Sequence, residues 1–197
     1  MNYPLTFRFK LIALAPQIYV TDASGRTICY VKQKLFRFRE KVEVFTDDTR
    51  QQLLATIEAD RIIDWSARYT FKSASGEVIG AVGRRGMKSL WRAHYDVFTG
   101  HDHAPVFAIQ EENPWVKMLD GLVGGIPILG MFAGYMLHPR YAASRVQGGE
   151  VVQRLTKQPA FFEGIFKLEP TGETNELEQT ALLLSYLMMN LLERARG

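Results

Sequence analysis

The sequence lacks most of the features that assign a protein to a chemical class. Its single cysteine, Cys29, excludes an internal disulfide framework and fits a reducing compartment. With 24 basic and 21 acidic residues the net charge is only +3, which is too weak by itself to indicate nucleic-acid binding. The N-terminal stretch has neither the charged-then-apolar layout nor the cleavage site of a signal peptide, so none is predicted.

Catalytic motifs are missing as well. The sequence holds no phosphate-binding loop, no nucleophile elbow, no zinc-binding histidine pair around a glutamate and no pair of closely spaced cysteines. Cys29 stands in an apolar run without a histidine nearby in the sequence, which is typical of a small core residue. We therefore predict no catalytic residue, no cofactor and no metal.

Short alternating segments dominate the chain. With 197 residues, 47% of them hydrophobic, the chain is long enough for one domain with a sizeable core. From residue 5 to about 111, apolar and polar residues alternate in short runs separated by turn residues, as in strands with one buried face. Similar runs return near 141–146, 150–157 and 161–168. About twelve antiparallel strands would leave many unpaired edges in open sheets, so a closed barrel or a sandwich is favoured.

A helix is predicted near the C-terminus, over about Glu176 to Arg194. Asn175 and Glu178 have the spacing of a capping box. From Ala181 to Leu192 the segment is apolar nearly all round, so protein or lipid must surround it. These residues rise only about 18 Å, which is too short for a hydrocarbon layer of about 30 Å. We therefore expect this helix to be buried inside the barrel.

A second helical segment interrupts the strands over residues 113–139. Asn113 followed by Pro114 is typical of a helix start, and two glycines at 124–125 interrupt the segment, so we predict a helical hairpin. An exposed hairpin of this composition would present a large apolar patch. We expect a membrane surface or a second copy of the chain to cover it, the alternative being its own barrel. The candidate contact residues are Trp115, Met118, Leu119, Leu122, Ile128, Leu129, Phe132, Tyr135 and Met136.

Two clusters of basic residues, over 32–41 and 84–92, are candidate anion-binding sites. The first is interleaved with aromatic residues, and the second surrounds a glycine-containing turn whose backbone N–H groups suit an anion. Either cluster fits lipid headgroups or nucleic-acid phosphates, and the alternative is a solvated strand face offset by nearby acidic residues. The candidate residues are Lys32, Lys34, Arg37, Arg39, Arg84, Arg85, Lys88 and Arg92.

Three histidines offer an enzymatic alternative. His101 and His103 flank an aspartate, and His94 would add a third nitrogen for a metal ion. That set would suit a metal-assisted hydrolase, whereas a polar hairpin loop explains the same spacing.

Three stretches carry a resemblance to a known family, namely TDASGRTICYVKQK, SGEVIGAVGRRGMKSLWRAHYDVF and ELEQTALLLSYLMMNLLERA. With them the chain resembles the LURP-one-related and phospholipid-scramblase-like family over roughly 5–111 and 141–194. The resemblance implies the tubby-like fold, in which twelve strands close around a central hydrophobic helix. The proline-rich arm, palmitoylated cysteines and acidic calcium-binding segment of scramblases are not found in this sequence, so calcium-activated lipid movement is not expected.

We therefore predict a mainly β protein, a closed antiparallel barrel of about twelve strands around a buried C-terminal helix. The single domain spans 1–197, with the first strands over 5–112, the hairpin insert over 113–139, the last strands over 140–170 and the central helix over 175–195. The expected function is non-enzymatic binding of an anionic or lipidic partner by a cytoplasmic protein at the periphery of a membrane. A homodimer through 114–139 is the alternative role of the insert. Beside the metal-assisted hydrolase, the remaining alternative is a nucleic-acid or transcription-linked module, which the net charge of +3 disfavours.

Overall fold

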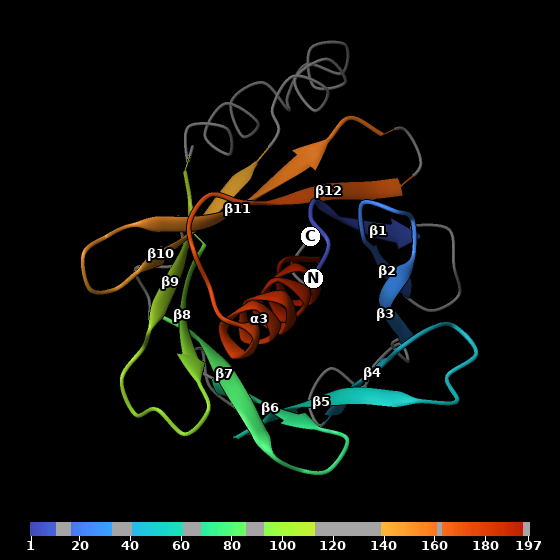
Figure 1. Ribbon diagram of the computed structural model, residues 1–197, viewed down its shortest axis with the longest axis horizontal. Coiled ribbons are helices and arrows are strands. Elements are labelled where there is room, and N and C mark those ends of the chain that lie inside the picture. The colour runs from blue at the N-terminus through green and yellow to red at the C-terminus, as the bar shows by residue number, and fades with distance from the viewer. Residues whose placement is uncertain are drawn as a thin grey trace, which may run out of the picture.

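The computed structural model describes residues 1–10, 17–32, 41–60, 68–85, 93–112, 139–160 and 163–194. These residues form twelve strands and one helix, α3 (Figure 1). The strands are β1 Leu5–Lys10, β2 Gln17–Thr21, β3 Thr27–Lys32, β4 Lys41–Phe45, β5 Leu53–Ala59, β6 Arg68–Ser73, β7 Val78–Arg84, β8 His94–Thr99, β9 Phe107–Glu111, β10 Arg140–Arg145, β11 Val151–Gln158 and β12 Glu163–Pro170. The helix α3 spans Glu176–Arg194.

The strands form one closed barrel. Each strand pairs in antiparallel fashion with the next one along the chain, and β1 closes the ring by pairing with β12. In this closing pair Leu5 lies opposite Leu168 and Phe7 opposite Phe166. Each of the twelve described strands therefore has a neighbour on both sides, which is how a sheet of many short strands avoids exposed edges. The predicted closed antiparallel barrel is therefore confirmed, and the sandwich is not formed.

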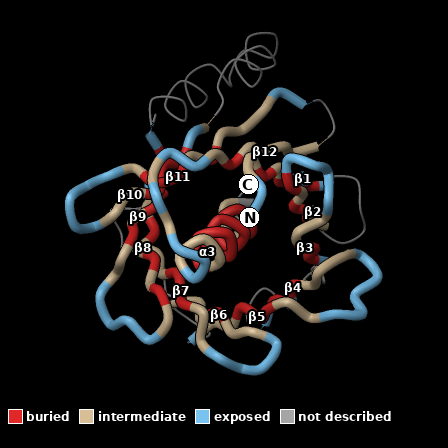
Figure 2. The backbone as a smooth tube through the Cα atoms, in the orientation of Figure 1, coloured by how far each residue is buried: buried red, intermediate tan, exposed pale blue. Residues whose placement is uncertain are grey.

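The helix α3 runs through the centre of the barrel (Figure 2). Every residue from Ala181 to Leu191 is buried, and Leu184 and Met188 have no exposed surface. Inward-facing side chains of the strands, such as Phe7 and Ile109, are equally buried and form one core with the helix. A helix that is apolar on all sides needs an apolar surface on all sides, and the barrel supplies it.

The start of α3 is fixed by the predicted capping box. The Asn175 N–H donates a hydrogen bond of 2.9 Å to Oε2 of Glu178, and the Glu178 N–H donates one of 2.9 Å to Oδ1 of Asn175. Two backbone donors that no helical carbonyl can reach are satisfied in this way. Within the described part of the chain, no helix combines the length and apolar character needed to cross a bilayer.

The barrel has two unlike ends. At the end where Asn175 caps α3, called here the cap end, successive strands are joined by short turns over 22–26, 46–52, 74–77, 100–106 and 146–150. At the opposite end, called the far end, the connections include the stretches 11–16, 33–40, 61–67, 86–92, 113–138 and 161–162, which lie outside the described residues. The hairpin predicted for 113–139 is thus outside the description except for Pro139.

Candidate functional site

Exposed basic residues mark the far end of the barrel. Lys32 ends β3, Lys41 begins β4 and Arg140 begins β10, and all three are exposed. Lys32 and Arg140 have no ion-pair partner within the described residues. Among the described residues near this end, five exposed residues are basic and two are acidic. The basic ones are Lys10, Lys32, Lys41, Arg85 and Arg140, and the acidic ones are Asp60 and Glu112.

The two neighbouring arginines of the second basic cluster point to opposite faces of the barrel wall. Arg84 lies opposite Tyr95, a fully buried residue, so its side chain is on the inner face. The next residue, Arg85, is exposed on the outer face, where its Nε lies 3.3 Å from Oδ2 of Asp96. Arg84 and Arg85 belong to one predicted anion-binding cluster, but the structure places their side chains on opposite faces of the wall.

The inner face near the far end is polar around the last turn of α3. The Tyr95 hydroxyl donates a 2.7 Å hydrogen bond to Oε1 of Glu193. Burial, reinforced by the charge of Glu193, raises the pKa of Tyr95 above its usual range, so its hydroxyl stays protonated. This contact ties the end of the helix to β8, which complements the cap at its start.

The predicted basic clusters and the predicted insert all belong to strand ends and connections at the far end. The stretch 33–40 connects β3 to β4, 86–92 connects β7 to β8, and 113–138 connects β9 to β10. In a barrel where each strand pairs with the next, every connection from an odd to an even strand joins strand ends at the same barrel end. The order of the predicted strands is the sequence signal that places all three connections at one end of the barrel. The composition of each cluster by itself does not contain this signal.

The sequence of these far-end connections is basic and rich in tryptophan. All three tryptophans of the chain belong to it, namely Trp65, Trp91 and Trp115. Its charged residues are Lys34, Arg37, Arg39, Arg61, Lys88, Arg92 and Lys117 against Glu40, Asp64 and Asp120. Most of the predicted site residues belong to these connections and lie outside the described residues. They are Lys34, Arg37, Arg39, Lys88, Arg92 and the nine insert candidates from Trp115 to Met136.

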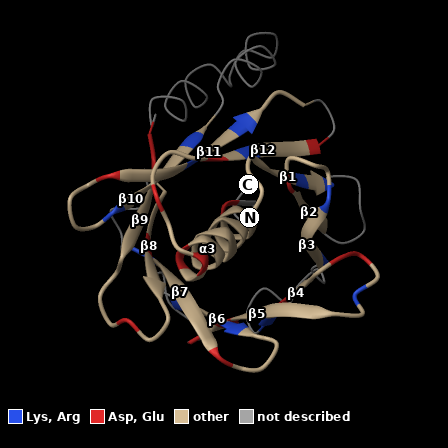
Figure 3. Cartoon of the chain, in the orientation of Figure 1, with Lys and Arg blue, Asp and Glu red and all other residues tan. Residues whose placement is uncertain are grey.

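The cap end carries the opposite charge (Figure 3). Its exposed acidic residues are Asp48, Glu77, Asp102, Glu150, Glu173 and Glu176, against the exposed basic residues Arg26 and Arg50. Several of them lie close to the start of α3, where acidic groups interact favourably with the helix dipole.

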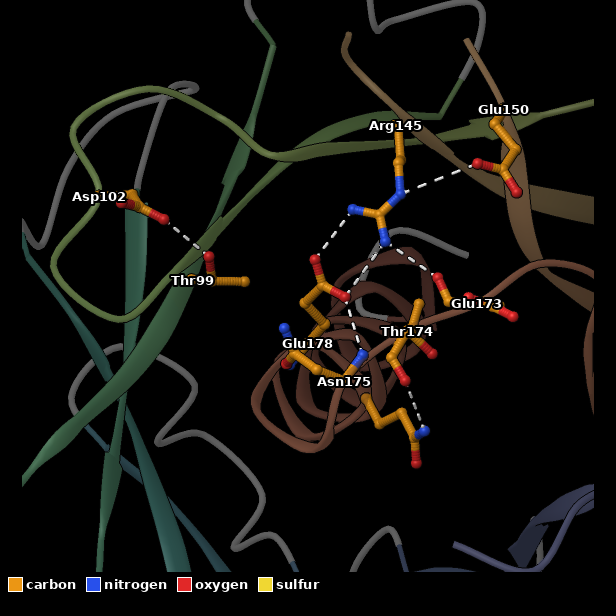
Figure 4. Close-up of polar contacts among 9 residues, drawn as sticks. Thr99, Asp102, Arg145, Glu150, Glu173, Thr174, Asn175 and Glu178 are labelled. Carbon is orange, nitrogen blue, oxygen red and sulfur yellow. Dashed lines mark hydrogen bonds and ion pairs between the residues drawn. The ribbon is translucent and has the colours of Figure 1, made fainter. Parts of the chain in front are cut away.

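Arg145 ties the barrel wall to the start of α3 at the cap end (Figure 4). Its Nη1 lies 2.9 Å from Oε1 of Glu178, and its Nη2 donates to Oε2 of the same carboxylate at 3.2 Å. The same Nη2 donates a 2.9 Å hydrogen bond to the carbonyl oxygen of Glu173. The guanidinium also lies over the ring of Phe107, 5.0 Å from its centroid. Arg145 is therefore occupied by the protein itself and holds the helix in register with the wall.

We expect this ion pair to make stability depend on pH. Burial raises the pKa of Glu178, but hydrogen bonds from Arg145 and the Asn175 N–H outweigh burial and hold that pKa below its usual range. A lowered folded-state pKa means that the stabilisation is present above the unfolded-state pKa of about 4.3 and is lost as the pH falls through the lower folded-state value. Glu178→Gln should cost roughly 2 kcal/mol at neutral pH, as expected for a partly buried charged hydrogen bond.

Urea unfolding at several pH values tests this expectation. The difference in unfolding free energy between the parent and Glu178→Gln should shrink as the pH is lowered through the acid range. A difference that stays constant down to acid pH would show that the carboxylate charge does not stabilise the helix start.

Hollows lined by described residues lie at the cap end. One of about 670 Å³ lies beside Arg145 and is lined by both polar and apolar groups, including Tyr3, Glu173 and Gln179. A second of about 540 Å³ lies between the turn holding His103 and the turn after β10. The third, about 530 Å³, is apolar and is described further below.

The three histidines do not form one site. His94 begins β8 at the far end, whereas His101 and His103 follow the same strand at the cap end. The length of this strand alone separates them by roughly 17 Å at about 3.3 Å per residue. Within the described residues, no three His, Cys, Asp or Glu side chains are placed to hold a metal ion. The structure therefore gives no support to the hydrolase built on these three residues.

Cys29 is a core residue, as its sequence context predicts. It is fully buried in β3, and burial raises the pKa of its thiol to about 12. The thiolate that would act as a nucleophile is therefore not available near neutral pH.

These observations define the class of the protein, a helix-filled twelve-stranded barrel with a basic far end and an acidic cap end. A sequence model described as LURP-one-related matches residues 27–121. The chain thus contains a LURP-one-related family domain, which confirms the resemblance predicted from its sequence.

The fold has a counterpart among solved structures. An X-ray structure of a protein from Arabidopsis thaliana matches with a TM-score of 0.53 and 14% sequence identity, covering 100% of this chain and 94% of that one. At this level of identity the likeness shows the fold alone. A search of curated proteins found no match.

Proposed function

We propose that this protein is a non-enzymatic binding module that docks the far end of its barrel on an anionic lipid surface. The observation that carries the proposal is topological. One end of the barrel holds both basic clusters and the predicted insert, in its strand ends and connections. The same end carries the exposed residues Lys32, Lys41 and Arg140.

The chemistry of that end suits lipid headgroups. Each lysine or arginine near an anionic membrane surface contributes about 1 kcal/mol of attraction. Tryptophan favours the boundary between headgroups and acyl chains, and all three tryptophans belong to the far-end connections. The acidic cap end would be repelled by the same surface, so the charge distribution orients the barrel with α3 ending toward the lipid.

Charge reversal at the far end should weaken lipid binding. In flotation with phosphatidylcholine vesicles containing phosphatidylserine, we expect Lys32→Glu/Arg140→Glu to bind at least about thirtyfold more weakly, since two attractions of about 1 kcal/mol are lost. Both side chains are exposed and have no ion-pair partner among the described residues, so the fold should be unaffected.

A matched control changes the same number of charges elsewhere. Arg50→Glu/Lys167→Glu alters an exposed residue of a cap-end turn and a half-exposed residue in the middle of β12. This variant should float like the parent. Equal loss in both variants would mean that net charge alone matters, and a parent that ignores anionic vesicles would contradict the proposal.

The predicted insert provides a separate arm of the same experiment. A variant lacking 114–139 that no longer floats would support lipid contact by the insert. A change from dimer to monomer in light scattering, with unchanged flotation, would assign the insert to self-association instead.

A further inference from the structure

An apolar groove opens at the cap end, between the start of α3 and β7. It measures about 530 Å³ and is lined by Ile79, Asn175, Glu176, Leu177 and Thr180. Leu177 is 46% exposed, whereas the helix is buried from Ala181 to Leu191. Among the large apolar residues described in α3, Leu177 is the exposed one. Apolar surface of the central helix therefore reaches solvent at this groove.

Acidic residues of three elements lie in this groove or in the turns next to it. Glu176 lines it from the helix, Glu77 precedes β7 in the turn after β6, and Asp102 lies in the turn after β8. The last two turns are neighbours, because the Gly100 N–H donates a 2.8 Å hydrogen bond to the carbonyl oxygen of Ile79. All three carboxylates belong to exposed residues.

The basic residues nearby are already engaged. The Arg68 guanidinium lies over the ring of Phe98, 3.9 Å from its centroid, and Nη2 of Arg68 donates to the backbone carbonyl of Asp102. Arg145 is held by Glu178, as described above. The groove therefore combines an apolar floor with a negative border.

We propose that this groove binds a cationic segment of a partner protein, which places one apolar side chain against Leu177 and basic side chains beside Glu77, Asp102 and Glu176. An anionic lipid would be repelled by this border. A peptide cannot join the barrel as an added strand, because the closed ring offers no free edge. A groove of this volume accommodates an anchoring side chain rather than a folded domain.

The groove lies at the end of the barrel opposite to the proposed lipid-binding end, and peptide binding there does not depend on lipid binding. If both hold, the barrel connects an anionic surface at one end to a basic protein segment at the other. Because the two tests use different probes and different variants, either proposal can fail alone.

The test uses the full chain labelled with ¹⁵N and titrated with a short peptide of lysines around a single tryptophan. We expect backbone amide shifts to change at Ile79, Leu177 and Thr180. Leu177→Ser and Glu77→Lys/Glu176→Lys should each weaken binding about tenfold, because the first removes the apolar contact and the second reverses the border charge.

Controls separate the groove from general attraction. Val146→Ser removes another exposed apolar side chain at the cap end, and Glu43→Lys reverses an exposed charge on β4, so both should bind the peptide like the parent. A peptide with serine in place of tryptophan should bind about tenfold more weakly, and one with glutamates in place of lysines should not bind.

Three results would overturn the inference. The first is shift changes spread over the surface instead of the groove, and the second is equal binding by Leu177→Ser and the parent. The third is concentration-dependent shifts at Leu177 without peptide that vanish in Leu177→Ser, which would make a second copy of the chain the occupant.

Discussion

Leu184→Asp is expected to abolish folding. Leu184 lies in the middle of α3, has no exposed surface and belongs to the core that the helix forms with the strands. An aspartate there would be an unpaired charge in an apolar interior, which costs several kcal/mol. A domain with about 5–15 kcal/mol of stability loses most or all of it in that way. Circular dichroism and the dispersion of amide resonances should show an unfolded chain, and Met188→Asp should behave alike.

An aspartate at an exposed position of the same helix is the matched control. Leu177 is 46% exposed in the first turn, where an acidic residue interacts favourably with the helix dipole. Leu177→Asp should therefore remain folded with nearly unchanged stability. A folded Leu184→Asp protein would contradict the enclosure of α3 by the barrel.

Gly80→Ala should destabilise the barrel strongly for a single methyl group. A Cβ atom at Gly80 would overlap the backbone carbonyl oxygen of Phe98 on the paired strand and lie 3.3 Å from Cβ of Ala181 on the helix. Neither a backbone carbonyl nor the enclosed helix can move aside without disturbing the strand pairing or the core. We expect a loss of about 3 kcal/mol, typical of overpacking, measured by urea unfolding.

Gly83 on the same strand provides the comparison. A Cβ atom at Gly83 would meet no atom within 4 Å. Gly83→Ala should change the unfolding free energy by less than about 1 kcal/mol, with stabilisation expected because alanine restricts the unfolded chain. Similar losses in both variants would mean that the approach of α3 to β7 does not require a glycine.

Local structure could be predicted from the sequence because its causes are local. The capping box of Asn175 and Glu178 and the apolar run after them predicted a helix over about Glu176 to Arg194, and α3 has these bounds. Alternation predicted the strands, and the number of short strands favoured closure. The excess of apolar surface on one helix then required an enclosing structure.

The local sequence pattern does not predict which candidate site residues lie close together in space. Adjacent arginines such as Arg84 and Arg85 look like one cluster in a sequence, yet strand geometry sends them to opposite faces. His94 and His101 are only seven residues apart in the sequence. The strand β8 lies between them, however, and places them at different ends of the barrel. The barrel end at which a basic cluster lies can be predicted only when the strands before it are counted.

The sequence by itself determined where the helix begins and ends, which strand positions face the core, and that an all-apolar helix had to be enclosed. These follow from periodicity, capping and burial, which act over a few neighbouring residues. The tertiary structure alone decided the closure of β1 on β12, the contact of Arg145 with Glu178 and the approach of Ala181 to Gly80. Those contacts join segments distant in the chain, and they form only when the whole core packs at once, so no local propensity encodes them.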